Sequence, residues 1–314
     1  MSNRNDRDVT DQVTTTDSSE VNREIDRIFT ELYPQASTQK LDRAFSDADR
    51  MYRGDLPGFM RCDTPYHDIQ HVLDVTLAMA RLIDGYERSR VGTEPMGKDL
   101  FQLGVITALF HDCGYIVRDT EESQHKNGAE FTVVHVSRGA DFLRQYLPVI
   151  GLPEQAEIAA DLIHFTGYER PVNSIRVPGL TYRLLGNLLG SADIIAQMSD
   201  RCYLEKCRDR LFPEFVHGGI AEKRQPNGEV QVMFASGNDL LKKTPGFYQG
   251  ANKRLVQDLD SGFSYAEQHF GGQNLYIEAV ERNIRFAESI GEEGDPSLLK
   301  RIPPDTLVRT DSEQ

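Results

Sequence analysis

Histidine and aspartate side chains recur inside apolar helical segments of this chain, and this feature constrains its fold more than any other. Asp193, for example, lies among Ala192, Ile194, Ile195 and Ala196. A bare carboxylate or imidazole in such surroundings is costly unless it is paired or coordinated. A carboxylate and several imidazoles that converge on one spot suit a divalent first-row metal ion. We therefore expect these side chains to share a metal site.

Two short motifs supply the first candidates. The sequence Tyr-His-Asp-Ile-Gln-His occupies positions 66–71, and Leu-Phe-His-Asp-Cys-Gly occupies positions 109–114. In a helix, His67 and His71 would lie one turn apart on the same face. His111 and Asp112 are adjacent where a helix is expected to end, so their side chains can diverge around one ion. Further candidates in or beside apolar helical stretches are His135, His164 and Asp193.

Each candidate also has an ordinary structural interpretation. A lone histidine in an apolar helix is more often a hydrogen-bonded core residue than a ligand, and Asp193 could be a helix N-cap. His125 is expected at the surface of an acidic loop, and His269 suits the C-terminal end of a helix. Taken together, the candidates favour metal binding over these interpretations. The chance that a chain contains all of them in this order is small.

Composition limits the classes of function. The chain has 314 residues, 39% of them hydrophobic and 27% charged, as is typical of a soluble globular protein. A formal net charge of −14 with no basic cluster argues against binding to long nucleic acids. No apolar stretch near the motifs is long enough to span a bilayer, and no signal peptide precedes them. The spacing of the four cysteines is not that of a disulfide framework, so we expect reduced thiols. We therefore expect a cytoplasmic protein without a membrane partner.

The hydrophobic periodicity predicts an all-α protein. Thr64 is the expected N-cap, and Pro65 the expected first residue, of the helix over 65–86. The sequence Pro-Asn-Gly at 226–228 predicts a β-hairpin-like loop. We expect a disordered N-terminal arm over 1–20, a single domain over 21–290 and a loosely ordered tail over 291–314. The expected helices cover 65–86, 98–112, 128–147, 153–165, 182–212, 248–270 and 275–290.

The order of these residues resembles the HD superfamily of metal-dependent phosphohydrolases. The resemblance covers roughly residues 65–207 and rests on His71, the pair His111-Asp112 and Asp193. Extra histidines between the pair and the last aspartate are similar to the binuclear branch, which includes HD-GYP proteins, cyclic nucleotide phosphodiesterases and diiron oxygenases. The resemblance implies an HD-type helical bundle with additional C-terminal helices.

The resemblance also assigns roles to individual residues. By position, His71, His111, Asp112 and Asp193 look like the ligands of one metal ion. Asp112 would bridge to a second ion, and the ligands of that ion would be His135 and His164. The Tyr66-His67 pair resembles the start of the cyclic nucleotide phosphodiesterase signature, which implies that His67 is a general acid. Arg201 resembles part of an HD-GYP segment and could reach a substrate phosphate; its ordinary alternative is a surface ion pair with Glu205.

The chain departs from the characterised branches at three places. Tyr115 stands where many related phosphohydrolases have lysine or glutamate soon after the His-Asp pair. Gly167-Tyr168 is followed by Glu169, so the Gly-Tyr-Pro signature of HD-GYP proteins is absent. His125 follows the pair only after an insertion over 116–124, although cyclic nucleotide phosphodiesterases have a histidine closer to it.

The expected function is metal-dependent hydrolysis of a small phosphorylated, nucleotide-like substrate, a phosphodiester or phosphomonoester. Two ions, drawn from Mn²⁺, Fe²⁺, Zn²⁺ and Mg²⁺, would supply the attacking hydroxide, with Asp112 between them and His67 donating to the leaving group. Two alternatives stay open: a diiron oxygenase with the same ligands, and a catalytically weak sensor that binds a nucleotide or metal. The sequence does not determine the substrate, the metal or the oligomeric state.

Overall fold

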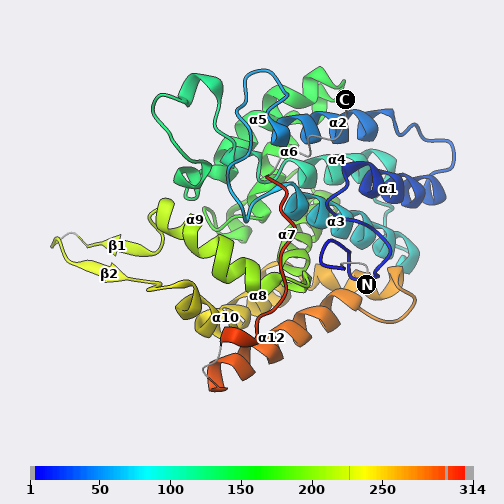
Figure 1. The fold of residues 1–314 in the computed structure, drawn as a ribbon. Coiled ribbons are helices and arrows are strands. Elements are labelled where there is room, and N and C mark those ends of the chain that lie inside the picture. Colours follow the sequence, from blue (N-terminus) through cyan, green and yellow to red (C-terminus); the bar gives the residue numbers. More distant parts are fainter. Residues whose placement is uncertain (1–3, 226, 294–295, 308–314) are drawn as a thin grey trace, which may run out of the picture.

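The computed structural model describes residues 4–225, 227–293 and 296–307, and within them it confirms the predicted all-α class. Figure 1 shows the helices gathered around a central pair, with one small hairpin projecting from the body. The α-helices are α1 (Ser18–Leu32), α2 (Gln39–Arg53), α3 (Ile69–Ser89), α4 (Gly97–Leu109), α5 (His135–Val149), α6 (Ala156–Leu162), α7 (Leu180–Ser199), α8 (Tyr203–Lys206), α9 (Phe212–His217), α10 (Gly237–Lys253), α11 (Ala266–His269) and α12 (Leu275–Glu293).

Helix α3 is the centre of the core. Every residue from Gln70 to Tyr86 is buried except Asp74, so α3 is covered on all sides rather than along one stripe. It packs against α7, α4, α1 and α11, while α5 and α6 pack against each other. Because α3 and α7 lie side by side, polar residues on their facing surfaces meet inside the molecule. In the described part of the chain, no helix combines the length and apolarity that crossing a membrane requires.

The predicted hairpin is confirmed. Strands β1 (Glu222–Arg224) and β2 (Val230–Val232) pair antiparallel, with Glu222 opposite Val232. Gly228 has a φ of 86°, a left-handed conformation that glycine adopts without steric cost. Pro226, which also belongs to the turn signal, lies outside the described residues. All six strand residues are exposed, and the hairpin projects away from the helices (Figure 1).

The N-terminal segment is packed against the helices, so the prediction of a disordered arm is wrong over residues 4–20. Asp8 is buried, and its Oδ2 lies 2.6 Å from a guanidinium nitrogen of the fully buried Arg81. Val13 is also buried, and Asp17 caps α1 by accepting from the backbone of Ser19. The polar composition hid this role, because the partner of Asp8 lies in a distant helix. Residues 1–3 lie outside the described part.

The C-terminal segment is also packed, so the prediction of a loosely ordered tail is wrong over residues 296–307. After α12 this segment, red in Figure 1, runs back across the molecule in front of α7. Arg210 donates to the carbonyl oxygens of Pro303, at 3.2 Å, and of Pro304. Thr306 donates to the side chain of Asp68, and the Ile302 carbonyl accepts from Asn5 at 2.9 Å. Residues 294–295 and 308–314 lie outside the described part.

Helix α3 begins later than predicted. Its N-cap is Asp68, whose side chain accepts from the backbone N–H of His71 at 3.0 Å. Thr64 instead donates through its hydroxyl to the carbonyl of His67 at 3.2 Å, which forms a turn ahead of the helix. The expectation of Thr64 as N-cap is therefore wrong, and His67 lies before the helix rather than one helical turn below His71.

Other predicted helices are divided into shorter pieces. The segment predicted as a helix over 182–212 contains α7, α8 and a π-helical turn, Cys207–Leu211, before α9 begins. A break between α7 and α8 is stabilised by Asp200, whose carboxylate accepts from the backbone of Cys202 at 2.7 Å. The segment predicted over 128–147 is a 3-10 turn, Gly128–Phe131, followed by α5. Periodicity located these apolar segments but did not show where side chains would interrupt them.

Candidate metal centre

The His-Asp pair lies in a turn that brings both side chains to one place. Helix α4 ends at Leu109, and a 3-10 turn, Cys113–Tyr115, follows the pair directly. A Cβ atom on Gly114 would lie only 1.9 Å from the carbonyl oxygen of His135, so only glycine allows this close approach to α5. His135 is the first residue of α5, and the close approach therefore places it beside the pair.

Three predicted ligands, His71, His111 and Asp112, form a group that could hold one ion, and Asp193 lies beside this group. Nε2 of His71 lies 3.1 Å from Oδ2 of Asp112, and Nε2 of His111 lies 3.2 Å from the same oxygen. The two Nε2 atoms are 3.3 Å apart. Oδ1 of Asp193 lies 3.6 Å from the His71 nitrogen and 3.8 Å from that of His111. Donors each about 2.1 Å from one ion stand roughly 3.0–3.5 Å apart, so the atoms of His71, His111 and Asp112 have the spacing of a metal site, and Asp193 lies slightly farther away.

The imidazole rings are oriented as metal ligands require. Nδ1 of His111 lies 2.7 Å from the carbonyl of Ala108, and Nδ1 of His135 lies 2.8 Å from that of Thr132. A carbonyl oxygen only accepts, so Nδ1 carries the hydrogen in both rings. In the neutral rings this leaves each Nε2 with a lone pair that faces the cluster. A backbone carbonyl that fixes the tautomer of a ligating histidine is a usual feature of metal sites.

Asp112 reaches toward a second position through its other oxygen. Nε2 of His135 lies 3.5 Å from Oδ1 of Asp112, whereas Oδ2 faces His71 and His111. The bridging role of Asp112 stays a prediction. His164 is less well placed for the second ion. It is buried, and its Nδ1 has no hydrogen-bond partner within the part of the chain that the structure describes and lies 3.9 Å from Oε2 of Glu169. Among the described residues, His164 forms neither a hydrogen bond nor an ion pair with Asp112.

Buried charge makes this cluster favourable for a cation. Burial lowers the pKa of His111, but Asp112 and Asp193 outweigh that effect and raise it to about 9. The neighbouring imidazoles overcome the effect of burial on Asp112 and hold its pKa well below the ordinary value. Burial lowers the pKa of His135. The two carboxylates thus attract one positive charge to the cluster, and either a proton on His111 or a metal ion can supply it.

A buried glutamate that the sequence did not reveal orients His67. Oε2 of Glu214 lies 2.5 Å from Nδ1 of His67, and Oε1 accepts from the backbone N–H of Tyr66 at 2.5 Å. Glu214 is on α9, in a region that the sequence predicted to be a loop. Burial lowers the pKa of His67, but Glu214 and the cluster carboxylates together raise it above its ordinary value. A positioned histidine with a raised pKa is a suitable proton donor.

Tyr115 packs against two histidines of the candidate site. Its ring stacks on His67 with 4.2 Å between centroids and on His135 with 4.3 Å, at 19° in both cases. The centroids of the two imidazole rings lie 6.3 Å apart with 37° between their planes, so Tyr115 packs against both rings rather than separating them. The side chain is buried, as expected for a core aromatic residue, but its neighbours are residues of the site.

Gln197 is a further residue that the sequence analysis did not assign. Its Nε2 lies 3.2 Å from Oδ1 of Asp193, one turn earlier on α7, and its Oε1 accepts from the hydroxyl of Tyr66 at 3.2 Å. The spacing of four residues from Asp193 was a signal that could have indicated this contact. The amide fixes the carboxylate of Asp193 relative to the cluster.

The cluster forms one end of a cavity of about 540 Å³, which we call the histidine cavity. The residues of the cluster side are His67, His71, Asp112, Tyr115, His135, Asp193 and Gln197. The opposite wall comes from α9, α10 and the segments that flank the hairpin, and it is mainly apolar. Its volume lies within the range of small-molecule sites, roughly 300–1,000 Å³.

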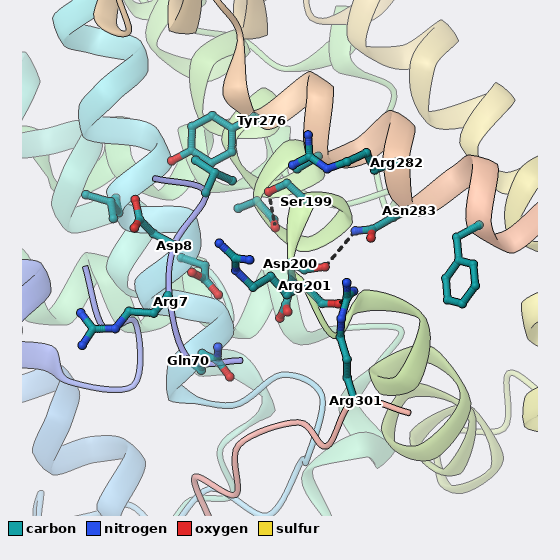
Figure 2. A pocket seen from close by; sticks show the side chains of 16 residues that line it. Arg7, Asp8, Gln70, Ser199, Asp200, Arg201, Tyr276, Arg282, Asn283 and Arg301 are labelled. Atoms are coloured by element: carbon teal, nitrogen blue, oxygen red, sulfur yellow. Dashed lines mark hydrogen bonds between the residues drawn. The ribbon is translucent and has the colours of Figure 1, made fainter. Parts of the chain in front are cut away.

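Arg201 does not reach this cavity, so its predicted contact with a substrate phosphate is wrong for this site. It follows the end of α7 and lines a second cavity of about 160 Å³, which we call the arginine cavity. Figure 2 shows Arg201 there among Arg7, Arg282 and Arg301. Its guanidinium lies 2.6 Å from Oδ1 of Asp11 in the N-terminal segment. The alternative pairing with Glu205 is replaced by this long-range ion pair, which the sequence could not indicate.

Comparison with protein families matches residues 53–290 to the Npun_R2479-like family, and the chain therefore belongs to this family. Neither the curated proteins nor the solved structures provide a match. The matched range begins at the end of α2 and extends into α12. It includes every residue of the metal cluster together with Glu214 and the apolar wall of the histidine cavity.

Proposed function

We propose that this protein is a metal-dependent phosphohydrolase of the HD type that acts on a small phosphorylated substrate. The single observation that carries the proposal is the convergence of His71, His111, Asp112 and Asp193, beside a histidine that is positioned to donate a proton. The ligand order along the chain and the three-dimensional arrangement agree with this class. When bound in such a site, a divalent ion supplies hydroxide near neutral pH and neutralises charge on a phosphoryl oxygen.

His67 would act as the general acid. Its Nδ1 donates to Glu214, so the proton available to a substrate is on Nε2. Glu214 is buried and stabilises the imidazolium form until the leaving oxygen takes this proton. Stacking on Tyr115 prevents rotation of the ring away from the cavity. General acid catalysis of this kind contributes about 10²- to 10⁴-fold to a rate.

The two oxygens of Asp112 would serve different positions. Oδ2 faces the first set of ligands, and Oδ1 faces His135. We propose that the first ion binds through the four converging donors and that a second ion binds between Asp112 and His135, with His164 as its further ligand. Mn²⁺, Fe²⁺, Zn²⁺ and Mg²⁺ are the candidate ions, with Mn²⁺ or Fe²⁺ favoured by the mixture of imidazole and carboxylate.

We favour hydrolysis over oxygenation because His67 is paired with Glu214. Hydrolysis of an ester needs a proton for its leaving oxygen, and this pair is built to provide one. A diiron oxygenase could use the same metal ligands but has no such requirement. We also propose that the protein acts in the cytoplasm, where its four buried cysteines, all free in the structure, stay reduced.

The deciding experiment combines metal analysis with a substrate panel. The full-length protein, purified without chelator, is assayed for bound metals by mass spectrometry and then loaded separately with each candidate ion. Each form is tested with phosphomonoesters and phosphodiesters, and oxygen consumption is followed in the Fe²⁺ form. We expect bound transition metal and release of phosphate or alcohol. Protein that binds no metal in any preparation would overturn the proposal, and oxygen consumption without hydrolysis would favour the oxygenase.

A further inference from the structure

The wall of the histidine cavity that faces the metal ligands is built from apolar side chains. Phe215 comes from α9 and Phe247 from α10, while Ile220 and Phe234 come from the segments on either side of the hairpin. The rings of Phe215 and Phe234 lie 5.5 Å apart between centroids, so they form a continuous surface. The wall is therefore assembled from segments that follow the ligand-bearing helices in the chain.

The π-helical turn before α9 contributes to the same wall. Cys207 begins this turn and Leu211 ends it, and both line the cavity. A π-helical turn adds a residue to the helical repeat and is often found at functional sites. Here it joins the cluster side, near Tyr203, to the apolar wall, near Phe215. Apolar side chains on both sides of this turn therefore line the same cavity as the metal ligands.

Part of this apolar surface is open to solvent. Phe247 is 49% exposed, and Val133, which lines the cavity beside His135, is 63% exposed. Large apolar side chains at the mouth of a cavity with polar groups at its base are typical of a site that buries an apolar part of its ligand. Leu240, in contrast, is buried on the same wall and anchors α10.

Few positively charged side chains line the cavity. Among the described residues that line it, Lys243 is the only lysine and there is no arginine. Lys243 donates to Oδ2 of Asp239 at 2.8 Å and to the carbonyl of Met233 at 2.7 Å, so it is already paired. A ligand with several phosphates would need more cationic partners than this wall provides. One phosphoryl group at the metal ligands and an uncharged remainder fit the cavity best.

We propose that the substrate is an amphiphilic phosphate monoester, with one phosphoryl group at the metal ligands and an aliphatic chain along the apolar wall. This inference rests on the proposed phosphohydrolase function and specifies its substrate class. In the reaction, the oxygen of water forms a new bond to phosphorus and the bond from phosphorus to the alkyl oxygen breaks. His67 gives its proton to that leaving oxygen, and the products are an alcohol and inorganic phosphate.

The test measures how hydrolysis depends on chain length. The metal-loaded, full-length protein is assayed with n-alkyl phosphates from ethyl to decyl, below their aggregation concentrations. Each methylene that the wall buries is expected to raise kcat/KM by about three- to fourfold, until the cavity is filled. Nucleoside monophosphates serve as competitors of similar size. A flat dependence on chain length, or a preference for the nucleotides, would overturn the inference.

Variants of the wall show whether Phe247 causes the dependence. Phe247→Ala should reduce kcat/KM for decyl phosphate at least tenfold and reduce that for ethyl phosphate much less, while Phe247→Leu should retain most of the preference. The matched control is Phe286→Ala, which removes the same side chain from the wall of the arginine cavity. Phe286→Ala should leave the chain-length profile unchanged. Equal losses for ethyl and decyl phosphate in Phe247→Ala would count against the proposal.

A binding measurement separates this inference from the proposed function. Decylphosphonate and ethylphosphonate cannot be hydrolysed by cleavage of an ester, and their affinity is measured by calorimetry with the metal-loaded protein. Tighter binding of decylphosphonate without turnover of any ester would support the apolar ligand and remove the hydrolase function. Turnover of ethyl phosphate with equal affinity for both phosphonates would support the hydrolase function and remove the amphiphilic substrate.

Discussion

The histidine cavity and the arginine cavity are both lined by residues of α3 and α7, yet their polar groups have different partners. In the histidine cavity, Nε2 atoms and carboxylate oxygens from distant segments face one another across about the width of one ion. In the arginine cavity, charged groups are mostly paired: Asp8 contacts Arg81, and Arg201 contacts Asp11. Several potential metal-ligand atoms that face one point indicate a binding site. Charged groups that are each paired with an opposite charge indicate a role in stabilising the fold.

The course of the chain after α7 explains why Arg201 lies in the arginine cavity. Asp193 and Arg201 are eight residues apart in the sequence, but α7 ends between them at Ser199. The chain then turns at Asp200, whose carboxylate lies 2.5 Å from Nζ of Lys206. The helix predicted over 182–212 would have continued through this turn. The actual turn directs Arg201 to the N-terminal segment instead.

The largest expected effect is loss of the metal site in Asp112→Ala. Asp112 faces His71, His111 and His135, so its removal should abolish metal binding and activity together. In the wild type, an ion present at 100 times its dissociation constant should stabilise the fold by about 2.7 kcal/mol. Thermal unfolding with and without Mn²⁺ would show this gain in the wild type and none in the variant. The matched control is Asp141→Ala, which removes an exposed carboxylate from α5. Full metal content in Asp112→Ala would contradict the role of Asp112 as a metal ligand.

The next effect concerns proton donation by His67. His67→Ala should retain the metal and the fold but lose about 10²- to 10⁴-fold in rate for a substrate with a poor leaving group. Nitrophenyl phosphate needs little protonation of its leaving group, so its loss should be smaller. The comparison is made with single-turnover rates for both substrates. Equal losses would remove His67 from the role of acid, and loss of metal would make it a ligand.

Glu214→Gln tests the cause of the raised pKa of His67. The acid must be protonated, so activity is present below this pKa and is lost as the pH rises through it. Replacing the carboxylate by a neutral amide removes the main partner that raises the pKa, so the alkaline limb of the pH–rate profile should move to lower pH. The profile of kcat/KM between pH 5 and 9 measures the shift. An unchanged alkaline limb would separate Glu214 from the titration.

In the arginine cavity we expect the largest change to be in stability. Asp8→Ala leaves the buried Arg81 without its carboxylate partner and should lower the free energy of unfolding by about 3–5 kcal/mol. Burial raises the pKa of Asp8, but Arg81 and hydrogen bonds outweigh it and lower the pKa overall. This contribution to stability is therefore present above the ordinary aspartate pKa and is lost as the pH falls through the lowered pKa. Denaturant unfolding at pH 7 and pH 3 tests both points, and kcat/KM should not change.

The smallest effect is expected for Arg201→Ala. The ion pair with Asp11 is about one-third exposed on both sides, at 32%, and pairs of this kind contribute about 0–1 kcal/mol. Its removal should shift the unfolding transition slightly and leave the kinetics unchanged. Steady-state kinetics on an accepted phosphate ester, with Asp11→Ala as the partner variant, provide the measurement. A tenfold loss of kcat/KM specific to Arg201→Ala would erase the distinction between the two cavities.

Much of the candidate site could be predicted because its residues carry a local signal. His71, Asp112 and Asp193 are polar residues in apolar segments, and the cost of burying them implied common partners. Glu214 gave no such signal, since an acidic residue after a proline in an expected loop is ordinary at a surface. Its partner His67 lies 147 residues away in the sequence. The predicted role of His164 in the second ion site remains a prediction.

The sequence by itself determined that the chain is all-α, and it singled out His71, His111, Asp112 and Asp193 as residues that should meet, because periodicity and burial cost are properties of short segments. Tertiary structure alone decided which groups pair with them. It placed Glu214 beside His67, packed Tyr115 against the rings of both His67 and His135, and covered the core with terminal segments whose polar composition predicted disorder. The physical reason is that a charged group is stabilised by whichever opposite charge or donor the folded chain brings near it, and the number of residues between them carries no information about that distance.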